Sequence, residues 1–188
     1  MTKPAPSLLA AFLLLTGCRD RNAGAGGSAE QAIADAVYQV LSADRETYAE
    51  DVVHRLQNLD KVIKAGEQWK QDKLLPLPAQ MFRMGAARVQ KRNTGLSYAL
   101  LSLWPINKQN GPRTDLEKAG LQAVAAQPAQ RFSGDEVLGG KHYFVAVYPD
   151  KAVSAACVGC HNDHPESPRS DFKVGDVMGA IVIRVAQR

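Results

Sequence analysis

Apolar residues recur at helical spacing along the first folded stretch of the chain and predict one long helix. These positions are Ile33, Val37, Val40, Leu41, Tyr48, Val52, Leu56, Leu59 and Ile63. Ser28, with Gln31 three residues later, predicts the start of the helix, and Gly66 is its expected end. The charged pair Asp44–Arg45 interrupts the apolar stripe. We therefore expect either a break near Ser42 or a protruding arm that pairs two copies of the chain.

The middle of the chain predicts two further helices with a strand between them. Residues 79–92 carry apolar side chains at helical spacing, whereas 96–104 (LSYALLSLW) is typical of a strand with apolar side chains on both faces. Residues 114–126 predict the second of these helices, with Thr114 as the N-cap and Glu117 completing a capping box.

The last third of the chain is strand-like. Val137-Leu138 leads through Gly139-Gly140, a hairpin signal, into residues 142–148 (HYFVAVY), and residues 177–185 (VMGAIVIRV) form the last predicted strand. Helices therefore come first and antiparallel strands come later, and this order predicts an α+β fold.

Composition indicates one globular domain and narrows the choice of partners. The chain has 188 residues, of which 45% are hydrophobic and 22% charged, and these values are ordinary for a single globular domain. The formal charge of +4 is not gathered in a basic block, so nucleic acid is not an expected partner. Three cysteines are too few for a mini-protein held together by disulfides, so each thiol needs its own explanation.

The first cysteine follows the pattern of a signal peptide. Lys3 supplies a positive start, and Leu8–Leu15 (LLAAFLLL) is an apolar run too short to span a bilayer, which needs about 20 residues. The segment 15–18 (LTGC) resembles the bacterial lipobox, in which cleavage precedes the cysteine and lipid is attached to it. We predict that Cys18 is lipidated. The alternative is a plain secretory signal in which Cys18 has no role.

This interpretation divides the chain into a signal peptide (1–17), a flexible tether rich in Gly and Ala (18–28) and one folded domain (29–188). No second long apolar run predicts a transmembrane helix. The mature protein is expected outside the cytoplasm, held on a membrane by its lipid. In many Gram-negative lipoproteins, an acidic residue directly after the lipidated cysteine is associated with retention in the inner membrane. Arg19 occupies that position here, so we expect the protein at the periplasmic face of the outer membrane in a Gram-negative cell.

The other two cysteines belong to a CxxCH motif at 157–161 (CVGCH). Two thiols three positions apart can each add to a vinyl group of one haem, and the following histidine is then held at the iron as an axial ligand. Haem of this type is attached outside the cytoplasm, in the compartment that the predicted signal peptide reaches. The motif predicts one covalent haem c, held by Cys157 and Cys160, with His161 as the proximal ligand.

Three other uses of these residues stay open. Cys157, Cys160, His161 and His164 could form the zinc site of a structural lipoprotein, although the adjacent Cys160 and His161 strain a tetrahedral chelate. A thioredoxin-like dithiol is the second alternative, although no βαβ pattern precedes the motif. A structural disulfide between the two cysteines is the third.

Six short segments carry a resemblance to a known family. They are 75–79 (LPLPA), 102–107 (SLWPIN), 148–150 (YPD), 157–164 (CVGCHNDH), 167–169 (SPR) and 171–179 (DFKVGDVMG). Together they are similar to the c-type haem, PAS-like domain of bacterial extracytoplasmic sensors, a family that also includes a cyanobacterial haem protein. The likeness covers nearly all of residues 48–185. It implies a helical N-terminal arm and a small antiparallel sheet with flanking helices, with the haem against the sheet.

The chain departs from this family in two respects. Many relatives carry a transmembrane helix and a kinase, cyclase or chemotaxis output, and neither is predicted here. Some relatives supply the second iron ligand from a cysteine on the first helix, where this chain has none. We therefore predict Met81 or Met84 as the distal ligand, since thioether ligands suit haem iron. Core packing of both methionines, ligation by Met178 and a vacant or water-filled position are the alternatives.

A few polar residues are candidates for contacts with the haem carboxylates. The basic ones are Arg83, Arg169 and Lys173, whose alternative is a solvated position or a local ion pair. His164 could reach a carboxylate or fix its own loop. The two remaining histidines, His54 and His142, are expected on the solvated surface.

The predicted function is redox or small-ligand sensing by a haem module at a membrane surface, with electron transfer as the alternative. A sensor of this size needs an output partner in another chain, and a carrier needs a redox partner. We expect no enzymatic role, because no His–Arg pair suited to an open iron is evident, and weak peroxidase activity is the alternative. A homodimer through the long first helix is a further expectation.

Overall fold

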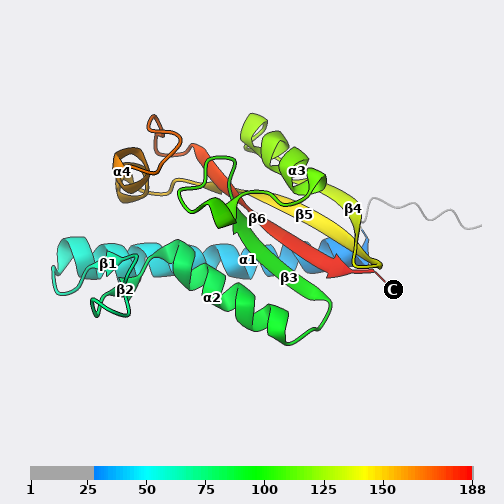
Figure 1. Cartoon of the computed structure of the whole chain (residues 1–188), viewed down its shortest axis with the longest axis horizontal. Helices are drawn as coiled ribbons and strands as arrows, with labels where there is room; N and C mark the ends of the chain where they lie inside the picture. Colours follow the sequence, from blue (N-terminus) through cyan, green and yellow to red (C-terminus); the bar gives the residue numbers. More distant parts are fainter. Residues whose placement is uncertain (1–27, 188) are drawn as a thin grey trace, which may run out of the picture.

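The computed structural model describes residues 28–187. In chain order the elements are α1 (Ala29–Thr47), η1 (Tyr48–Leu59), β1 (Ala65–Gly66), β2 (Leu75–Pro76), α2 (Pro78–Lys91), β3 (Leu96–Leu101), η2 (Lys108–Asn110), α3 (Asp115–Ala126), β4 (Phe132–Leu138), β5 (Lys141–Lys151), α4 (Ala155–Asp163) and β6 (Val177–Ala186). The longer strands form an open, four-stranded antiparallel sheet (Figure 1). The predicted α+β class with an N-terminal helical arm is confirmed.

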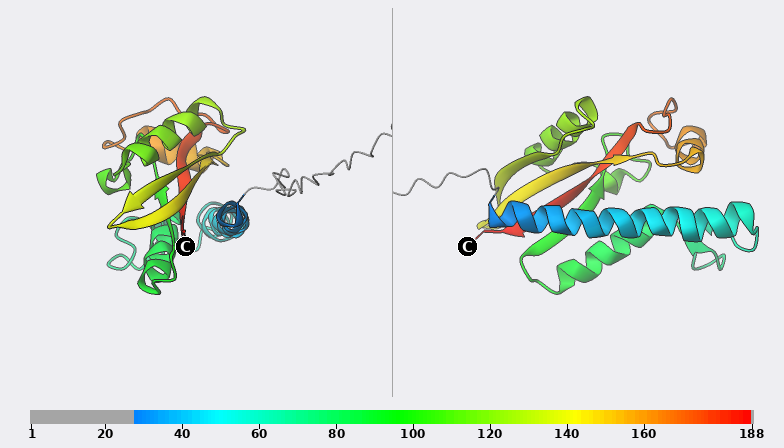
Figure 2. Two further views of the ribbon diagram at one scale, coloured as in Figure 1. Left: turned by 90° about the vertical axis from the view of Figure 1, so that its right-hand side faces the viewer. Right: turned by 180° about the vertical axis from the view of Figure 1, so that it is seen from behind.

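The sheet has the strand order β3-β6-β5-β4, and helices cover both of its faces (Figure 2). Successive side chains of a strand point to opposite faces, so β5 serves two cores. Val145 and Val147 pack with α3 on one face. Ala146 and Tyr148 pack with α1 and α2 on the other. The two-faced strand predicted at 96–104 divides in the same way, and its regular part ends at Leu101.

The N-terminal helix is continuous but changes its winding at Tyr48. Its start is confirmed, because the Ser28 hydroxyl accepts a hydrogen bond from the backbone N–H of Gln31 at 3.1 Å. From Tyr48 the chain takes up the wider π-helical winding of η1, which ends at Leu59. The prediction of an end at Gly66 is therefore wrong, since Gly66 belongs to β1.

Of the two alternatives expected for the long helix, the break near Ser42 is wrong, because the helix continues through this position, and Arg45 supplies the reason. Its Nη2 donates a hydrogen bond to Oδ2 of Asp150 at 2.8 Å. The polar interruption of the apolar stripe thus faces the end of β5, where it has a partner, and the helix runs on. Beyond this point η1 extends past the end of the sheet as a protruding arm (Figure 2). Whether the arm pairs with a second copy stays a prediction.

Several local signals in the sequence are confirmed. Gly139 and Gly140 turn the β4–β5 hairpin with φ values of +56° and +75°, as a type I′ turn requires. The Thr114 hydroxyl accepts from the N–H of Glu117 at 3.1 Å, and the Glu117 carboxylate accepts from the N–H of Thr114 at 3.1 Å, which completes the capping box.

Two boundaries differ from the predictions for identifiable reasons. The strand before the hairpin, β4, begins at Phe132 rather than Val137. The sequence did not reveal its first part because residues 133–136 (SGDE) contain no apolar side chain. The strand β3 stops where Ser102 leaves the sheet. The Ser102 hydroxyl donates to the carbonyl of Met178 at 2.6 Å and accepts from the N–H of Trp104 at 2.9 Å.

The contact between α3 and the sheet depends on Gly120. A β-carbon there would lie 2.6 Å from Cγ2 of Val147 and 3.0 Å from Cδ1 of Phe132. We expect Gly120→Ala to destabilise the fold, because overpacking costs about 1–3 kcal/mol and the better helix propensity of Ala returns only about 1 kcal/mol. Urea unfolding measures the difference, with exposed Lys118→Ala on the same helix as the control. An unchanged unfolding midpoint for Gly120→Ala would contradict the prediction.

Candidate functional site

The CxxCH motif forms its own short helix, α4, which the sequence pattern did not reveal. It begins directly after β5, with Ser154 as the N-cap residue. Residues three and four apart lie on one side of a helix. The helix therefore places Cys157, Cys160 and His161 on a common side, at the end of the molecule where η1 extends past the sheet (Figure 1).

The ring of His161 is held in one orientation. Its Nδ1 lies 3.1 Å from the carbonyl oxygen of Cys157. A carbonyl can only accept, so Nδ1 carries the hydrogen and the lone pair is on Nε2. Burial lowers the pKa of His161, an effect that its hydrogen bond to Cys157 opposes. The imidazole is therefore neutral at neutral pH, with the nitrogen that a metal can bind available at Nε2.

The two cysteines are free thiols in different surroundings. Cys157 is half-buried and packs against the cluster of Ala152, Phe172 and Met178. Cys160 is exposed at the surface of α4. Its pKa is raised, mainly by partial burial and then by the negative charge of Glu67. The raised pKa keeps the Cys160 thiol protonated at neutral pH.

The loop after α4 is folded back onto the helix. The side-chain amide of Asn162 donates to the carbonyl of Phe172 at 3.0 Å and accepts from its N–H at 3.0 Å. The guanidinium of Arg169 lies over the rings of Phe172 and Trp104, at 4.3 and 4.9 Å from their centroids. Arg169 also pairs with Asp171 at 2.6 Å. Arg169 therefore forms a local ion pair, which was the alternative to a contact with the haem carboxylates.

His164 also has a local role. Its Nδ1 accepts from the N–H of Glu166 at 3.1 Å, and its Nε2 lies 3.5 Å from the carboxylate of Glu67. These contacts hold the turn after α4 against the segment that follows η1. Within residues 28–187, no three His, Cys, Asp or Glu side chains converge as metal ligands. The geometry therefore does not support the zinc alternative built from Cys157, Cys160, His161 and His164.

The predicted distal ligands lie on another element. Met81 and Met84 are half-buried on α2, a helix that packs mainly against β3 and also contacts η1. The structure does not bring either side chain into the α4 cluster, and their role as ligands stays a prediction. Met178 does lie beside Cys157, in the buried cluster with Phe172.

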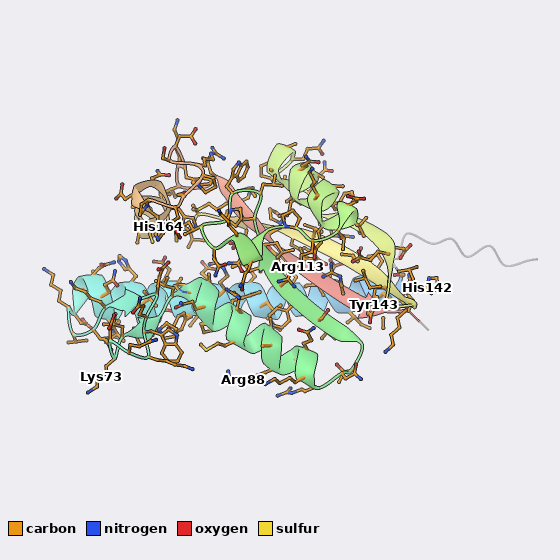
Figure 3. All side chains as sticks on the ribbon, in the orientation of Figure 1. Lys73, Arg88, Arg113, His142, Tyr143 and His164 are labelled. Atoms are coloured by element: carbon orange, nitrogen blue, oxygen red, sulfur yellow. The ribbon has the colours of Figure 1, made fainter. Side chains whose placement is uncertain are left out.

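The remaining histidines are not gathered at α4. His142 lies at the hairpin end of β5, at the opposite end of the molecule from His164 (Figure 3). His54 is half-buried on η1, and its Nδ1 lies 3.0 Å from the amide nitrogen of Asn58.

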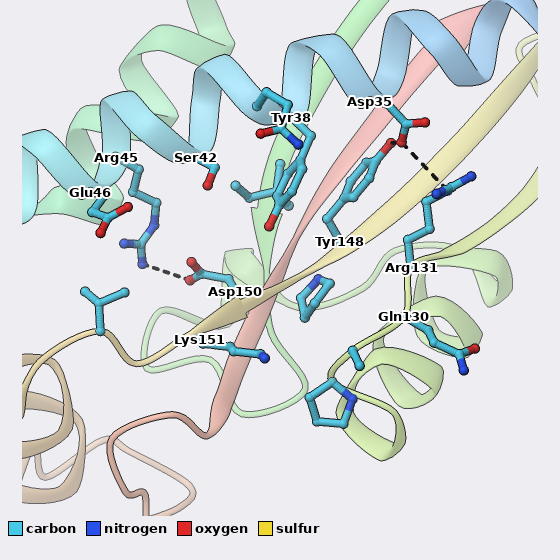
Figure 4. A pocket seen from close by; sticks show the side chains of 16 residues that line it. Asp35, Tyr38, Ser42, Arg45, Glu46, Gln130, Arg131, Tyr148, Asp150 and Lys151 are labelled. Atoms are coloured by element: carbon cyan, nitrogen blue, oxygen red, sulfur yellow. Dashed lines mark hydrogen bonds and ion pairs between the residues drawn. The ribbon is translucent and has the colours of Figure 1, made fainter.

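A polar groove of about 700 Å³ lies beside the site, between α1, the end of β5 and the segment 128–131 (Figure 4). Arg45 and Asp150 form a largely buried ion pair in it, with 15% and 14% of their side chains exposed. Burial raises the pKa of Asp150, and the Arg45 guanidinium opposes that rise. Sequence reasoning did not assign these two residues to the site. The signals were the charged interruption of the first helix, which contains Arg45, and the family-like segment 148–150 (YPD), which contains Asp150.

The fold and site together define an α+β domain that presents a CxxCH helix beside the end of its sheet. The sequence model of one family, described as Tll0287-like: Tll0287, matches residues 27–186. The chain therefore belongs to the Tll0287-like family. Its fold is similar to that in the crystal structure of the cyanobacterial heme-protein Tll0287, with a TM-score of 0.57, 16% identity, and coverage of 87% of this chain and 98% of that chain. No curated protein matches the sequence.

The predicted signal peptide and Cys18 lie outside the described residues. Of the helices between residues 28 and 187, none combines the length and the apolar character needed to cross a bilayer.

Proposed function

We propose that this chain is a c-type haem protein that binds one haem covalently through Cys157 and Cys160, with His161 as the proximal ligand. The observation that carries the proposal is the arrangement on α4. Two free thiols and a neutral imidazole share one side of a short helix, and the hydrogen bond from Nδ1 of His161 to Cys157 leaves Nε2 for the iron. Family membership and the likeness to a heme-protein support the same conclusion.

The residues around α4 provide an apolar surface for a covalent haem and hold the haem-binding helix in place. The cluster of Phe172, Met178 and Trp104 beside Cys157 supplies an apolar surface. The Asn162–Phe172 hydrogen bonds hold the following loop against α4 and so fix the position of the helix. When bound, the iron of a haem supplies one-electron transfer or the binding of a small ligand.

We place this module outside the cytoplasm, anchored to a membrane through lipid on Cys18, at the periplasmic face of the outer membrane if the cell is Gram-negative. The lipobox-like segment 15–18 and the glycine-rich tether support this location. Its role is redox or small-ligand sensing, and the output belongs to a separate signalling protein. The resemblance to c-type haem sensor domains supports this role.

Electron transfer is the second candidate, and the exposure of Cys160 favours it. A haem edge bonded to an exposed cysteine would begin at the surface of the protein. A redox partner could then approach that edge without a conformational change. Carbon monoxide added to the reduced protein separates the two functions. A changed absorption spectrum favours sensing at an open iron site, whereas an unchanged spectrum favours a closed site suited to electron transfer.

The central test is the mass and colour of protein exported together with a cytochrome c assembly system. We expect a Soret band that survives acid–acetone extraction, because thioether bonds do not release the haem. The intact mass is expected to equal the chain from Cys18 with acyl groups and one macrocycle. Colourless protein that contains only the polypeptide and its acyl groups would reject the haem proposal. A haem-loaded chain without acyl groups would reject only the lipid anchor.

A further inference from the structure

Arg45 has a buried hydrogen-bond donor without a partner. Its Nη2 is bonded to Asp150 at 2.8 Å. Its Nε is buried and makes no hydrogen bond to any residue in the described part of the chain. A buried donor left unsatisfied destabilises the fold, and nearly all such groups in proteins have an acceptor. The position of Nε therefore points to an acceptor that the polypeptide itself does not provide.

The groove that contains Arg45 is next to the haem-binding helix. Val153 lines the groove, and the following residue, Ser154, is the N-cap of α4. The charges of Arg45 and Asp150 both act on the pKa of His161, in opposite directions, although burial is the larger cause of its shift. The ion pair therefore lies within electrostatic range of the proposed proximal ligand.

The chemistry of the groove suits a carboxylate. Arg45, Arg131 and Lys151 supply cationic groups from three segments of the chain (Figure 4). Asp35 is already used, because it accepts from the Tyr148 hydroxyl at 2.7 Å and lies 3.7 Å from Arg131.

The remaining acids of the groove do not compete for Arg45 Nε. Asp150 is paired with Arg45 through its other nitrogen, and Glu46 is on the exposed side of α1. The Nε–H of an arginine and a neighbouring N–H of its guanidinium form a favourable donor pair for a carboxylate. In Arg45 the Nε–H has no acceptor among the described residues.

We propose that Arg45 binds a carboxylate of the haem through its Nε, with the groove between α1 and β5 receiving that side of the cofactor. This inference rests on the proposed function, because attachment to α4 keeps the two haem carboxylates close to the groove at high effective concentration. It gives Arg45 the role that the sequence suggested for Arg83, Arg169 or Lys173. Arg169 is stacked and ion-paired, and Arg83 and Lys173 are exposed.

The experiment compares holoprotein variants by resonance Raman spectroscopy, in which the bending bands of the haem carboxylates report their hydrogen bonds. Arg45→Lys keeps the charge that faces Asp150 but removes Nε, and we expect it to shift one carboxylate band. Arg45→Gln is expected to shift the same band. Arg88→Gln, which removes an exposed arginine from α2, is the matched control and should leave the bands unchanged. Intact mass confirms one attached haem in each sample.

A purely structural role for Arg45 predicts a different pattern. In that case Asp150→Asn, which breaks the ion pair but keeps Nε, would change the bands as much as Arg45→Lys does. Our assignment predicts that Asp150→Asn leaves the carboxylate band in place. Bands that are identical in wild type and both Arg45 variants, with haem attached, would overturn the assignment and leave the haem proposal intact.

The wild-type protein provides a test that needs no variant. A crystal structure of the holoprotein should show a haem carboxylate oxygen within hydrogen-bond distance of Arg45 Nε. Water or a free acid at that position, with both haem carboxylates elsewhere, would refute the assignment. Wild-type protein that carries no haem would reject the proposed function, and the assignment would fail with it.

Discussion

Replacing both Cys157 and Cys160 by alanine is expected to abolish covalent haem attachment, with a complete loss of the Soret band that survives acid–acetone extraction. The reason is chemical. Each thioether bond needs its own thiol, and Cys157 and Cys160 are the free thiols of the described chain. The measurement is absorbance of the extracted, denatured protein, together with haem staining on a denaturing gel. Haem retained after extraction of the double variant would contradict the assignment.

Two further variants on α4 provide the control for haem attachment and the test of the proximal ligand. Gly159→Ala is the matched control, because a β-carbon at this position has no atom within 4 Å and helical spacing places it away from the cysteines. It should keep the attached haem. His161→Ala should retain covalently bound haem if its thioethers form, but with a changed spectrum, because the proximal nitrogen is lost. A His161→Ala spectrum identical to wild type would remove His161 from the ligand set.

The sequence carries a prediction for the chemistry of this helix, whereas it did not reveal the helix itself. CxxCH is a local motif whose residue types and spacing carry the haem prediction by themselves. The helix that bears it has no apolar stripe, since Cys, Gly and Ala occupy most of its positions, so periodicity could not reveal α4. What orients His161 is a bond to a backbone carbonyl, and a sequence pattern does not contain that information.

Long-range polar pairs account for the other differences. The capping box at Thr114 and the hairpin at Gly139 depend on residues close in sequence, and both were predicted. Arg45 pairs with Asp150, which is distant along the chain, so the sequence showed Arg45 only as an interruption of an apolar stripe. The same limitation hid the groove, because α1 and β5 come together only in the folded chain.

A second long-range polar cluster, made of Arg184, Glu117 and Glu136, is expected to have the largest effect on stability. Arg184, on β6, donates to Glu117 of α3 at 2.6 Å and to Glu136 of β4 at 2.7 Å. Burial alone would lower the pKa of Arg184, but its hydrogen bonds to the two carboxylates outweigh burial and raise it. Only 12% of the Arg184 side chain and 4% of the Glu117 side chain are exposed. One guanidinium therefore joins α3 and β4 to β6, one of the two inner strands of the sheet.

We expect Arg184→Met to destabilise the fold by about 3–5 kcal/mol, because removal of one partner leaves buried charges without compensation. Urea unfolding of the variant measures this loss, and Arg88→Met on the exposed face of α2 is the matched control, with a change within about 0.5 kcal/mol. A loss for Arg184→Met as small as that of the control would show that the buried network contributes little.

The pH dependence of this loss tests its cause. Without Arg184, the carboxylates of Glu117 and Glu136 would be largely buried negative charges without their cationic partner, and such charges disfavour folding. Acid neutralises carboxylates, so a penalty that comes from stranded negative charge decreases as the pH falls. The stability difference between wild type and Arg184→Met should therefore narrow as the solution is acidified. A difference that is constant with pH would indicate that lost packing by the arginine side chain, rather than stranded charge, causes the destabilisation.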